Sequence, residues 1–357
     1  MQKSQHGGAS ETYSQEVDEK NTLKMREILK ELPSFCRQFF RGISENTGTR
    51  TRLAYAYDLR VFFEYMHENN CELTKIKIPD FPVSVLDQIQ KVDLEEFLDW
   101  TTYYTKNGKV YTNDERGKSR KLSAIRSMYQ YFYQSEQIRR DVSALIPMPK
   151  LHEKPIIRLE PNEVARLLDL AEDGEGLTKT EQRFHNKTAV RDTALLTLLL
   201  GTGIRVSECV GLDLDDVNFE ENGIRVHRKG GYDAIVYFGD EVEQALRRYL
   251  EARMQIIPQE GSENALFLSL QNRRITVRAV EKLVKKYASR ITTLKKITPH
   301  KLRSTYGTSL YRETGDIYLV ADVLGHKDVN TTRKHYAAIE EDRRRRAANI
   351  VKLREDN

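Results

Sequence analysis

The sequence predicts a mainly α-helical protein of two domains, and three observations support this fold class. Apolar residues recur at helical spacing through most of the first 150 positions. Four prolines between residues 147 and 161 form the densest proline cluster and indicate an extended linker. An alternating stretch, residues 216–239, predicts a small three-stranded antiparallel sheet in an otherwise helical second half. The length of 357 residues exceeds that of a typical single domain and fits two.

The first half is predicted to contain a polar tail followed by a helical domain. Residues 1–24 lack an apolar pattern, so we expect them to be disordered. Residues 25–150 form the first domain, with four segments of helical spacing at 25–43, 49–68, 92–105 and 117–136. No segment before Pro147 is predicted to be a strand.

Residues 151–160 are predicted to be the linker, and residues 161–357 the second domain. A helix should begin near Pro161, because proline is tolerated in the first helical turn. The apolar run "DTALLTLLLGTG" predicts a helix that ends at glycine. Residues 172–190 are expected to form a surface loop, the tip of a hairpin falls between Lys229 and Asp233, and the chain becomes helical again from Thr276 onward.

Composition limits the classes of function. With 39% hydrophobic and 31% charged residues and no apolar run near the ~20 residues of a membrane helix, no membrane partner is expected. The N-terminus lacks the apolar core of a signal peptide, and three scattered cysteines give no disulfide framework, which favours the cytoplasm. No Cys/His cluster has zinc spacing and no GxxxxGK[ST] loop is present, so neither a metal, a nucleotide nor another cofactor is expected.

Basic residues interleaved with tyrosines favour a polyanion as the partner. The net charge of +5 is mild, but lysines and arginines cluster in both halves of the chain. Any single cluster is equally well explained as a solvated helix face. The candidate DNA-binding residues are Arg50, Arg52, Lys118, Arg120, Lys121, Arg126 and Arg278.

Six residues of the second half carry groups suited to chemistry at a phosphodiester. Guanidinium forks bind non-bridging oxygens, an ammonium or imidazolium protonates a leaving oxygen, and a hydroxyl attacks phosphorus. Each residue alone has a simpler structural explanation, such as a helix cap, a turn or a solvent-exposed side chain. The candidates are Arg205, Lys229, His300, Arg303, His326 and Tyr336.

Three motifs in order, "TGIRVSE", "HKLRSTYGTSL" and "LGHKDVNTTRKHY", resemble those of the tyrosine recombinases or phage-type integrases. The similarity covers residues 25–350, and the two-domain layout resembles the Xer-type members. It implies a SAM-like, four-helix core-binding domain and a mostly helical catalytic domain that clamp double-stranded DNA. It also implies a homotetramer on two paired sites, coupled by a C-terminal docking helix.

The resemblance assigns a role to each candidate. It implies that Tyr336 is the nucleophile of a 3′-phosphotyrosyl intermediate, with neither metal nor ATP needed. Arg205 and Arg303 match the arginines that bind the scissile phosphate, and the acidic Glu208 supports the first of them.

The remaining roles are less sharply defined. His300 matches a general base or phosphate ligand, His326 a second phosphate donor, and Lys229 the general acid. Arg228 competes with Lys229 for the last role, and Ser304 stands where a histidine often follows the arginine.

Two other functions share part of this pattern. A type IB topoisomerase uses the same chemistry, and a non-catalytic DNA-binding regulator would explain the charge but not the ordered reactive residues. A recombinase explains both. We therefore expect a site-specific recombinase in the nucleoid-associated cytoplasm, acting in chromosome or plasmid dimer resolution or in integration and excision of a mobile element.

Overall fold

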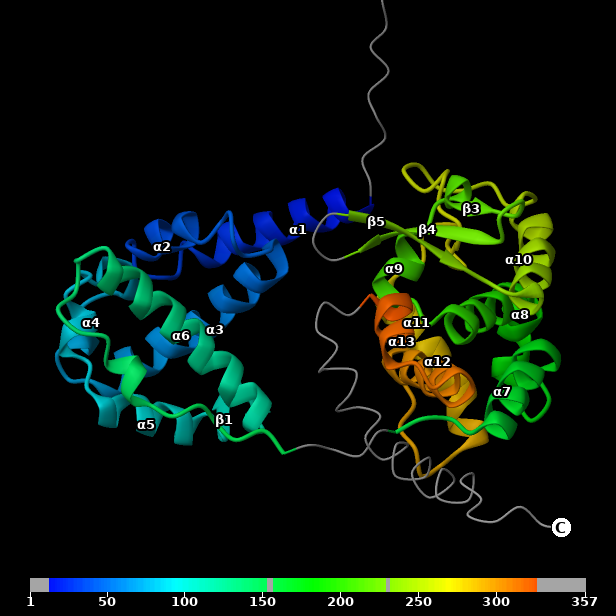
Figure 1. Cartoon of the computed structure of the whole chain (residues 1–357). Helices are drawn as coiled ribbons and strands as arrows, with labels where there is room; N and C mark the ends of the chain where they lie inside the picture. The colour runs from blue at the N-terminus through cyan, green and yellow to red at the C-terminus, as the bar shows by residue number, and fades with distance from the viewer. Residues whose placement is uncertain (1–12, 153–156, 229–231, 326–357) are drawn as a thin grey trace, which may run out of the picture. The chain divides into compact units, whose positions relative to one another are not determined.

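The chain divides into two compact units, an N-terminal unit, Met1–Lys154, and a C-terminal unit, Pro155–Asn357. The computed structural model describes residues 13–152, 157–228 and 232–325 (Figure 1). The division falls inside the segment expected to be the linker. Within the described residues, no helix combines the length and apolar character needed to span a membrane.

The N-terminal unit is built from helices with one short hairpin. Helix α1 packs against α3, which in turn packs against α6. Its elements are α1 (Tyr13–Ile28), α2 (Cys36–Gly42), α3 (Thr49–Asn69), η1 (Leu73–Lys75), η2 (Ile78–Asp80), α4 (Val85–Gln88), α5 (Lys91–Trp100), β1 (Tyr103–Lys106), β2 (Lys109–Thr112), α6 (Glu115–Gln134) and η3 (Val142–Leu145).

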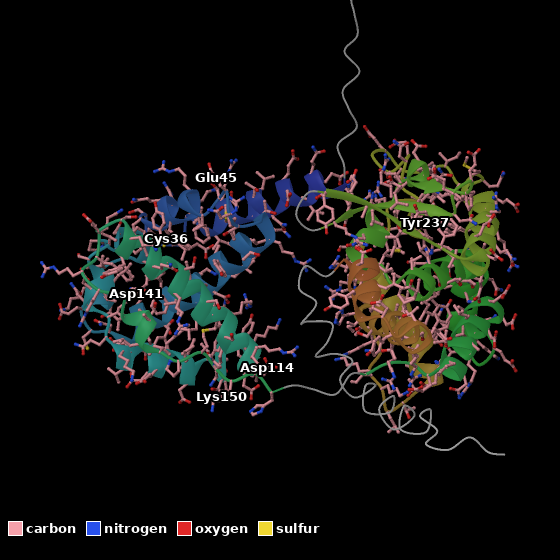
Figure 2. The ribbon with its side chains drawn as sticks, viewed as in Figure 1. Cys36, Glu45, Asp114, Asp141, Lys150 and Tyr237 are labelled. Atoms are coloured by element: carbon pink, nitrogen blue, oxygen red, sulfur yellow. The ribbon has the colours of Figure 1, made fainter. Side chains whose placement is uncertain are left out.

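Aromatic side chains fill the core of this unit. Phe62 of α3 meets Phe97 of α5 edge to face, with ring centroids 5.2 Å apart, a favourable arrangement for two aromatic rings. Cys36 is fully buried at the start of α2, as its position in Figure 2 illustrates. Leu59, Phe63 and Met66 of the second predicted helical segment are buried with Phe62, whereas Tyr57 of the same segment is exposed.

The polar tail is shorter than the sequence predicts. Residues 13–24 are helical and belong to α1, so the expectation of disorder is wrong for this part. Met25 and Ile28 near the end of α1 are buried, and the helix packs on α3. This tertiary contact stabilises a helix whose own sequence carries little apolar pattern.

A β-hairpin between α5 and α6 contradicts the prediction that the first half lacks strands. Strands β1 and β2 pair antiparallel around Asn107 and Gly108, whose φ angles are +49° and +71°. Asn-Gly is the preferred pair for such a two-residue turn. Tyr104 stacks on Trp100 at 4.3 Å and on Tyr111 at 5.2 Å, which ties the hairpin to the helices.

The C-terminal unit combines helices with one small sheet. Helices α8 and α10 pack together, and α12 contacts both α8 and α13 (Figure 1). Its elements are α7 (Pro161–Asp173), α8 (Lys179–Thr202), α9 (Val206–Gly211), η4 (Leu214–Asp216), β3 (Val217–Asn218), β4 (Gly223–Arg228), β5 (Tyr232–Tyr237), α10 (Asp240–Arg253), α11 (Val277–Ile291), α12 (Pro299–Thr314) and α13 (Ile317–Leu324).

The predicted mainly α fold with a three-stranded antiparallel sheet is confirmed. The strand order is β3-β4-β5, and the ladder between β4 and β5 runs from Gly223 opposite Tyr237 to Arg228 opposite Tyr232. Tyr237 is exposed on β5 (Figure 2). The predicted hairpin tip includes residues 229–231, which lie outside the described residues.

The surface loop predicted at residues 172–190 is mostly helix. Residues 179–190 form the first half of α8, which continues through the apolar run to Thr202. Thr178 and Glu181 cap the helix start reciprocally, since the Thr178 hydroxyl accepts from the Glu181 amide and the Glu181 carboxylate accepts from Thr178. Gly203, with φ of +63°, ends the helix where the sequence predicts.

Candidate active site

Arg205 lies at the junction of α8 and α9, two residues after Gly203, the glycine that ends α8. It is the residue before the first turn of α9, so its backbone N–H has no backbone carbonyl of the helix to bond to and needs a side-chain partner. The buried Glu208 carboxylate accepts from that N–H at 2.7 Å and from the Arg205 guanidinium at 2.6 Å. Glu208 therefore both caps α9 and orients the guanidinium, in the supporting position that the sequence predicts.

Arg303 approaches the same place from α12. Its side chain is buried, with 6% of its surface exposed, and its Nη1 donates to the Gly203 carbonyl at 2.7 Å. Its Nη2 donates to the carbonyl of Leu324 at the end of α13. A Cβ on Gly203 would come within 2.3 Å of Tyr306, so glycine here permits both the left-handed turn and the close approach of α12.

Helix α13 is fixed at both ends. Asp316 accepts from the amides of Tyr318 and Leu319 at its start. Val320 and Leu324 form a small apolar core with Tyr311 of α12. The C-terminal end of α13 is thus held beside the two arginines.

Three guanidinium groups converge on the C-terminal carbonyls of α13. Arg228 at the end of β4 donates to the carbonyls of Asp322 at 3.3 Å and Val323 at 2.8 Å. Arg303 binds the next carbonyl along the helix, and Arg205 binds the one after it, that of Gly325, at 3.1 Å. The last carbonyls of a helix lack intrahelical partners and carry partial negative charge, so they suit cations.

This cluster of cations gives the site a positive character. It holds three guanidinium groups, and the Glu208 carboxylate is bonded to one of them, that of Arg205. Guanidinium forks match the geometry of phosphate oxygens, and a charged phosphate competes favourably with neutral carbonyls for the same donors. The arrangement can therefore bind a phosphodiester at the end of α13.

The other predicted site residues lie around this cluster or beyond the described residues. His300 is exposed in the first turn of α12, three residues before Arg303 and thus on the same side of the helix. Lys229 and His326 directly follow Arg228 and Gly325, but they and Tyr336 lie outside the described residues. The structure brings Arg205, Glu208 and Arg303 to the C-terminal end of α13.

Two nearby nucleophilic side chains are unsuited to attack. Burial raises the pKa of the Tyr306 phenol, and it raises the pKa of the Cys209 thiol strongly, with the Glu208 charge adding to the effect. Both groups therefore stay protonated. In the described part of the chain, no group of three or more histidine, cysteine or acidic side chains is placed to hold a metal ion.

The basic residues of the N-terminal unit separate into exposed and structural ones. Arg50 is exposed and Lys118 is half-buried, while Arg120 is exposed but paired with the buried Asp58 carboxylate. Lys121 is buried, and its ammonium lies 3.5 Å from the Asp58 carboxylate. Its prediction as a DNA contact is therefore corrected, since a buried, paired ammonium cannot reach a phosphate.

Arg126 has a second structural role, because its guanidinium donates to the carbonyls of Ser143 and Ile146. Arg52 is half-buried in α3, whereas Arg278 is exposed in α11 of the C-terminal unit. As candidates for DNA contacts, the exposed Arg50 and Arg278 are therefore better supported than Arg52 and Arg126.

The sequence analysis leaves Arg228 as an alternative to Lys229 for the general acid. In the structure, Arg228 contacts the C-terminal end of α13. Its Nη1 and Nη2 donate to backbone carbonyls, and its strand precedes Lys229. No sequence pattern indicates this, because the partners lie 94 and 95 positions away.

Comparison with known proteins agrees with this geometry. Residues 157–343 match the model of the phage integrase family. The chain belongs to the phage integrase family. It is 31% identical over 299 residues to tyrosine recombinase XerD of Oceanobacillus iheyensis, covering 82% of this chain and 88% of the relative. It is also 31% identical to tyrosine recombinase XerC of Caldanaerobacter subterraneus subsp. tengcongensis, covering 92% and 89%.

Solved structures show the same fold. The site-specific recombinase XerH, bound to a palindromic difH substrate in a post-cleavage complex, matches with a TM-score of 0.65 and 22% identity, covering 92% of this chain and 89% of that one. The Tn1549 transposon integrase in complex with circular intermediate DNA matches with a TM-score of 0.59 and 21% identity, covering 84% and 94%. The identification as a tyrosine recombinase is confirmed and favoured over a type IB topoisomerase or a non-catalytic regulator.

Proposed function

We propose that this phage integrase family member cuts and rejoins specific DNA sites through Tyr336. The observation that carries the proposal is the convergence of the Arg205 and Arg303 guanidinium groups at the end of α13, directly before His326. Both arginines can bind the non-bridging oxygens of one phosphate at that point, where they would stabilise the charge that develops during attack.

The reaction balances without a co-reactant. The Tyr336 oxygen passes its proton to His300 as the general base and bonds to phosphorus, while the bond from phosphorus to the 5′ oxygen breaks. Lys229 donates the proton that the departing 5′ oxygen takes up, and His326 donates to the phosphate. The 3′-phosphotyrosyl bond conserves the energy of the phosphodiester, so a 5′-hydroxyl can reverse the step without ATP.

The partner we propose is double-stranded DNA carrying paired sites, bound by a homotetramer. The support is the similarity of most of the chain to Xer-type recombinases and the positive cluster in the C-terminal unit. Such an enzyme would act at the nucleoid in the cytoplasm, in resolution of chromosome or plasmid dimers or in exchange of a mobile element. Sequencing the DNA that a Tyr336→Phe variant retains from the source genome would identify the site and separate these roles.

A nicked duplex carrying that site tests the nucleophile. Cleavage beside the nick releases a short fragment, so the covalent complex accumulates. The wild type should be trapped on the DNA, whereas Tyr336→Phe should bind and form no adduct. Tyr306→Phe is the matched control, because Tyr306 lies against Gly203 but has a half-buried phenol whose pKa is raised by desolvation. An adduct that persists in Tyr336→Phe and disappears in Tyr306→Phe would refute the assignment.

A further inference from the structure

Arg228 joins the β4–β5 hairpin to the C-terminal end of α13. Besides its two bonds to carbonyls, its guanidinium lies close to Gly325, where an added Cβ would come within 2.0 Å of Nη1 and 2.9 Å of Nε. Gly325 has a φ of +61°, a conformation that also favours glycine. The pair of residues thus forms a close contact between two segments 97 positions apart in the chain.

This contact lies where two segments of the proposed active site begin. Lys229 follows Arg228 in the chain, and His326 follows Gly325. The two described residues that precede them, Arg228 and Gly325, are therefore in direct contact.

The three arginines of the cluster differ in what they do when a phosphate arrives. Arg205 and Arg303 also donate to carbonyls of α13, but under the proposed function their forks turn to the scissile phosphate. The end of α13 then loses the donors to its last two carbonyls. Arg228 donates to the two preceding carbonyls, those of Asp322 and Val323, and can keep these bonds while the phosphate is bound.

We propose that Arg228 is a positioning residue of the recombination reaction. It holds the end of α13 and the end of strand β4 together while Arg205 and Arg303 bind the phosphate. The inference rests on the proposed function. It differs from the role of a general acid, because a guanidinium does not give up its proton in proteins.

The test compares Arg228→Ala and Arg228→Lys with wild type in the full-length chain. Arg225→Ala is the matched control, since Arg225 lies on the same strand but is exposed and bonds to Asp216 at 2.9 Å. Three quantities are measured: amide hydrogen exchange of residues 317–325 without DNA, affinity for the nicked duplex, and the rate of covalent adduct formation. A second duplex carries sulfur in place of the 5′ bridging oxygen.

We expect exchange in residues 317–325 to rise by roughly tenfold in Arg228→Ala, because charge-assisted bonds to the helix end are lost. Adduct formation should fall by about 100-fold, the scale of a small misplacement of reacting groups, while DNA affinity stays near that of wild type. Arg228→Lys should show exchange and adduct formation intermediate between Arg228→Ala and wild type, because an ammonium keeps the charge but loses the planar fork. Arg225→Ala should behave as wild type, and sulfur should not rescue Arg228→Ala.

Three results would overturn the inference. Unchanged exchange in residues 317–325 would show that Arg228 does not hold α13. Rescue by sulfur would make Arg228 part of the proton delivery, and a loss confined to DNA affinity would make it a DNA contact. The exchange measurement needs neither DNA nor activity, so it remains informative if the wild type forms no adduct and the proposed function itself fails.

Discussion

Replacing Asp58 by alanine should destabilise the N-terminal unit far more than removing an exposed charge. The Asp58 carboxylate is buried in α3, 2.5 Å from Arg120 and 3.5 Å from the ammonium of the buried Lys121. After Asp58→Ala, the side-chain acceptor left beside Lys121 is the amide oxygen of Asn113, at 2.9 Å. Breaking a buried pair costs about 3–5 kcal/mol, or roughly 6–20 °C in Tm for a unit of this size.

The single tryptophan of the chain gives a selective assay. Trp100 stacks on Tyr104 in the N-terminal unit, so its fluorescence follows unfolding of that unit in urea or on heating. Glu72→Ala is the control, because its ion pair with Lys75 is exposed and should contribute at most about 1 kcal/mol. The double variant Asp58→Leu/Lys121→Met should recover most of the loss, since it removes both buried charges.

The pH dependence supplies an independent check. Burial raises the pKa of Asp58 above its ordinary value of 3.8, although Arg120 and Lys121 oppose the shift. The folded unit therefore binds a proton that the unfolded chain has lost, and the stability from this group declines as pH rises from about 3.8 through the folded pKa. Asp58→Asn should lack this decline. Equal losses in Asp58→Ala and Glu72→Ala, or no recovery in the double variant, would refute the reasoning.

Three further predictions concern the reaction and its DNA. Lys229→Ala should cleave the normal site poorly and a 5′-bridging sulfur site at near the wild-type rate, since a thiolate of ordinary pKa about 8.5 leaves without a proton; Arg303→Ala should stay impaired on both. If Lys229→Ala cleaves the sulfur-substituted site as poorly as the normal site, Lys229 is not the general acid. DNA affinity in gel shifts should fall with salt with a log–log slope near −0.9 per neutralised phosphate, and a nearly salt-independent affinity would argue against phosphate contacts. Deleting residues 345–357 should preserve binding to one site and weaken cooperative binding to two, whereas unchanged cooperativity would argue against docking of this segment on a neighbouring protomer.

Local sequence patterns were sufficient for most of the helices and for the family. Apolar spacing reports which face of a helix meets a core, and it predicts the second helical segment, residues 49–68, close to the observed α3. The three ordered motifs identify a tyrosine recombinase because each places its reactive residues at fixed spacings within a short stretch of sequence. Both signals depend on neighbours in the chain.

Local sequence signals also exist for the β1–β2 hairpin, the burial of Lys121 and the start of α8. Asn107 and Gly108 between two tyrosine-rich segments carry the pattern of a two-residue hairpin turn. Lys121 lies four residues before the buried Ile125 on the apolar face of α6, which marks it as a core residue rather than a surface cation. Thr178 and Glu181 have the spacing of a capping box and mark the start of α8.

The sequence by itself determined which residues are available for the reaction, and the tertiary structure decided where their charges meet. Arg205, Arg228 and Arg303 come from a helix start, a strand end and a helix interior, and nothing in their local sequences indicates a shared partner. They meet because packing of α12 and the β4–β5 hairpin around α13 presents its last four carbonyls to them. These hydrogen bonds join residues that lie 21 to 120 positions apart in the chain. Local periodicity does not encode them, because it reports only on neighbours within a few positions of each other.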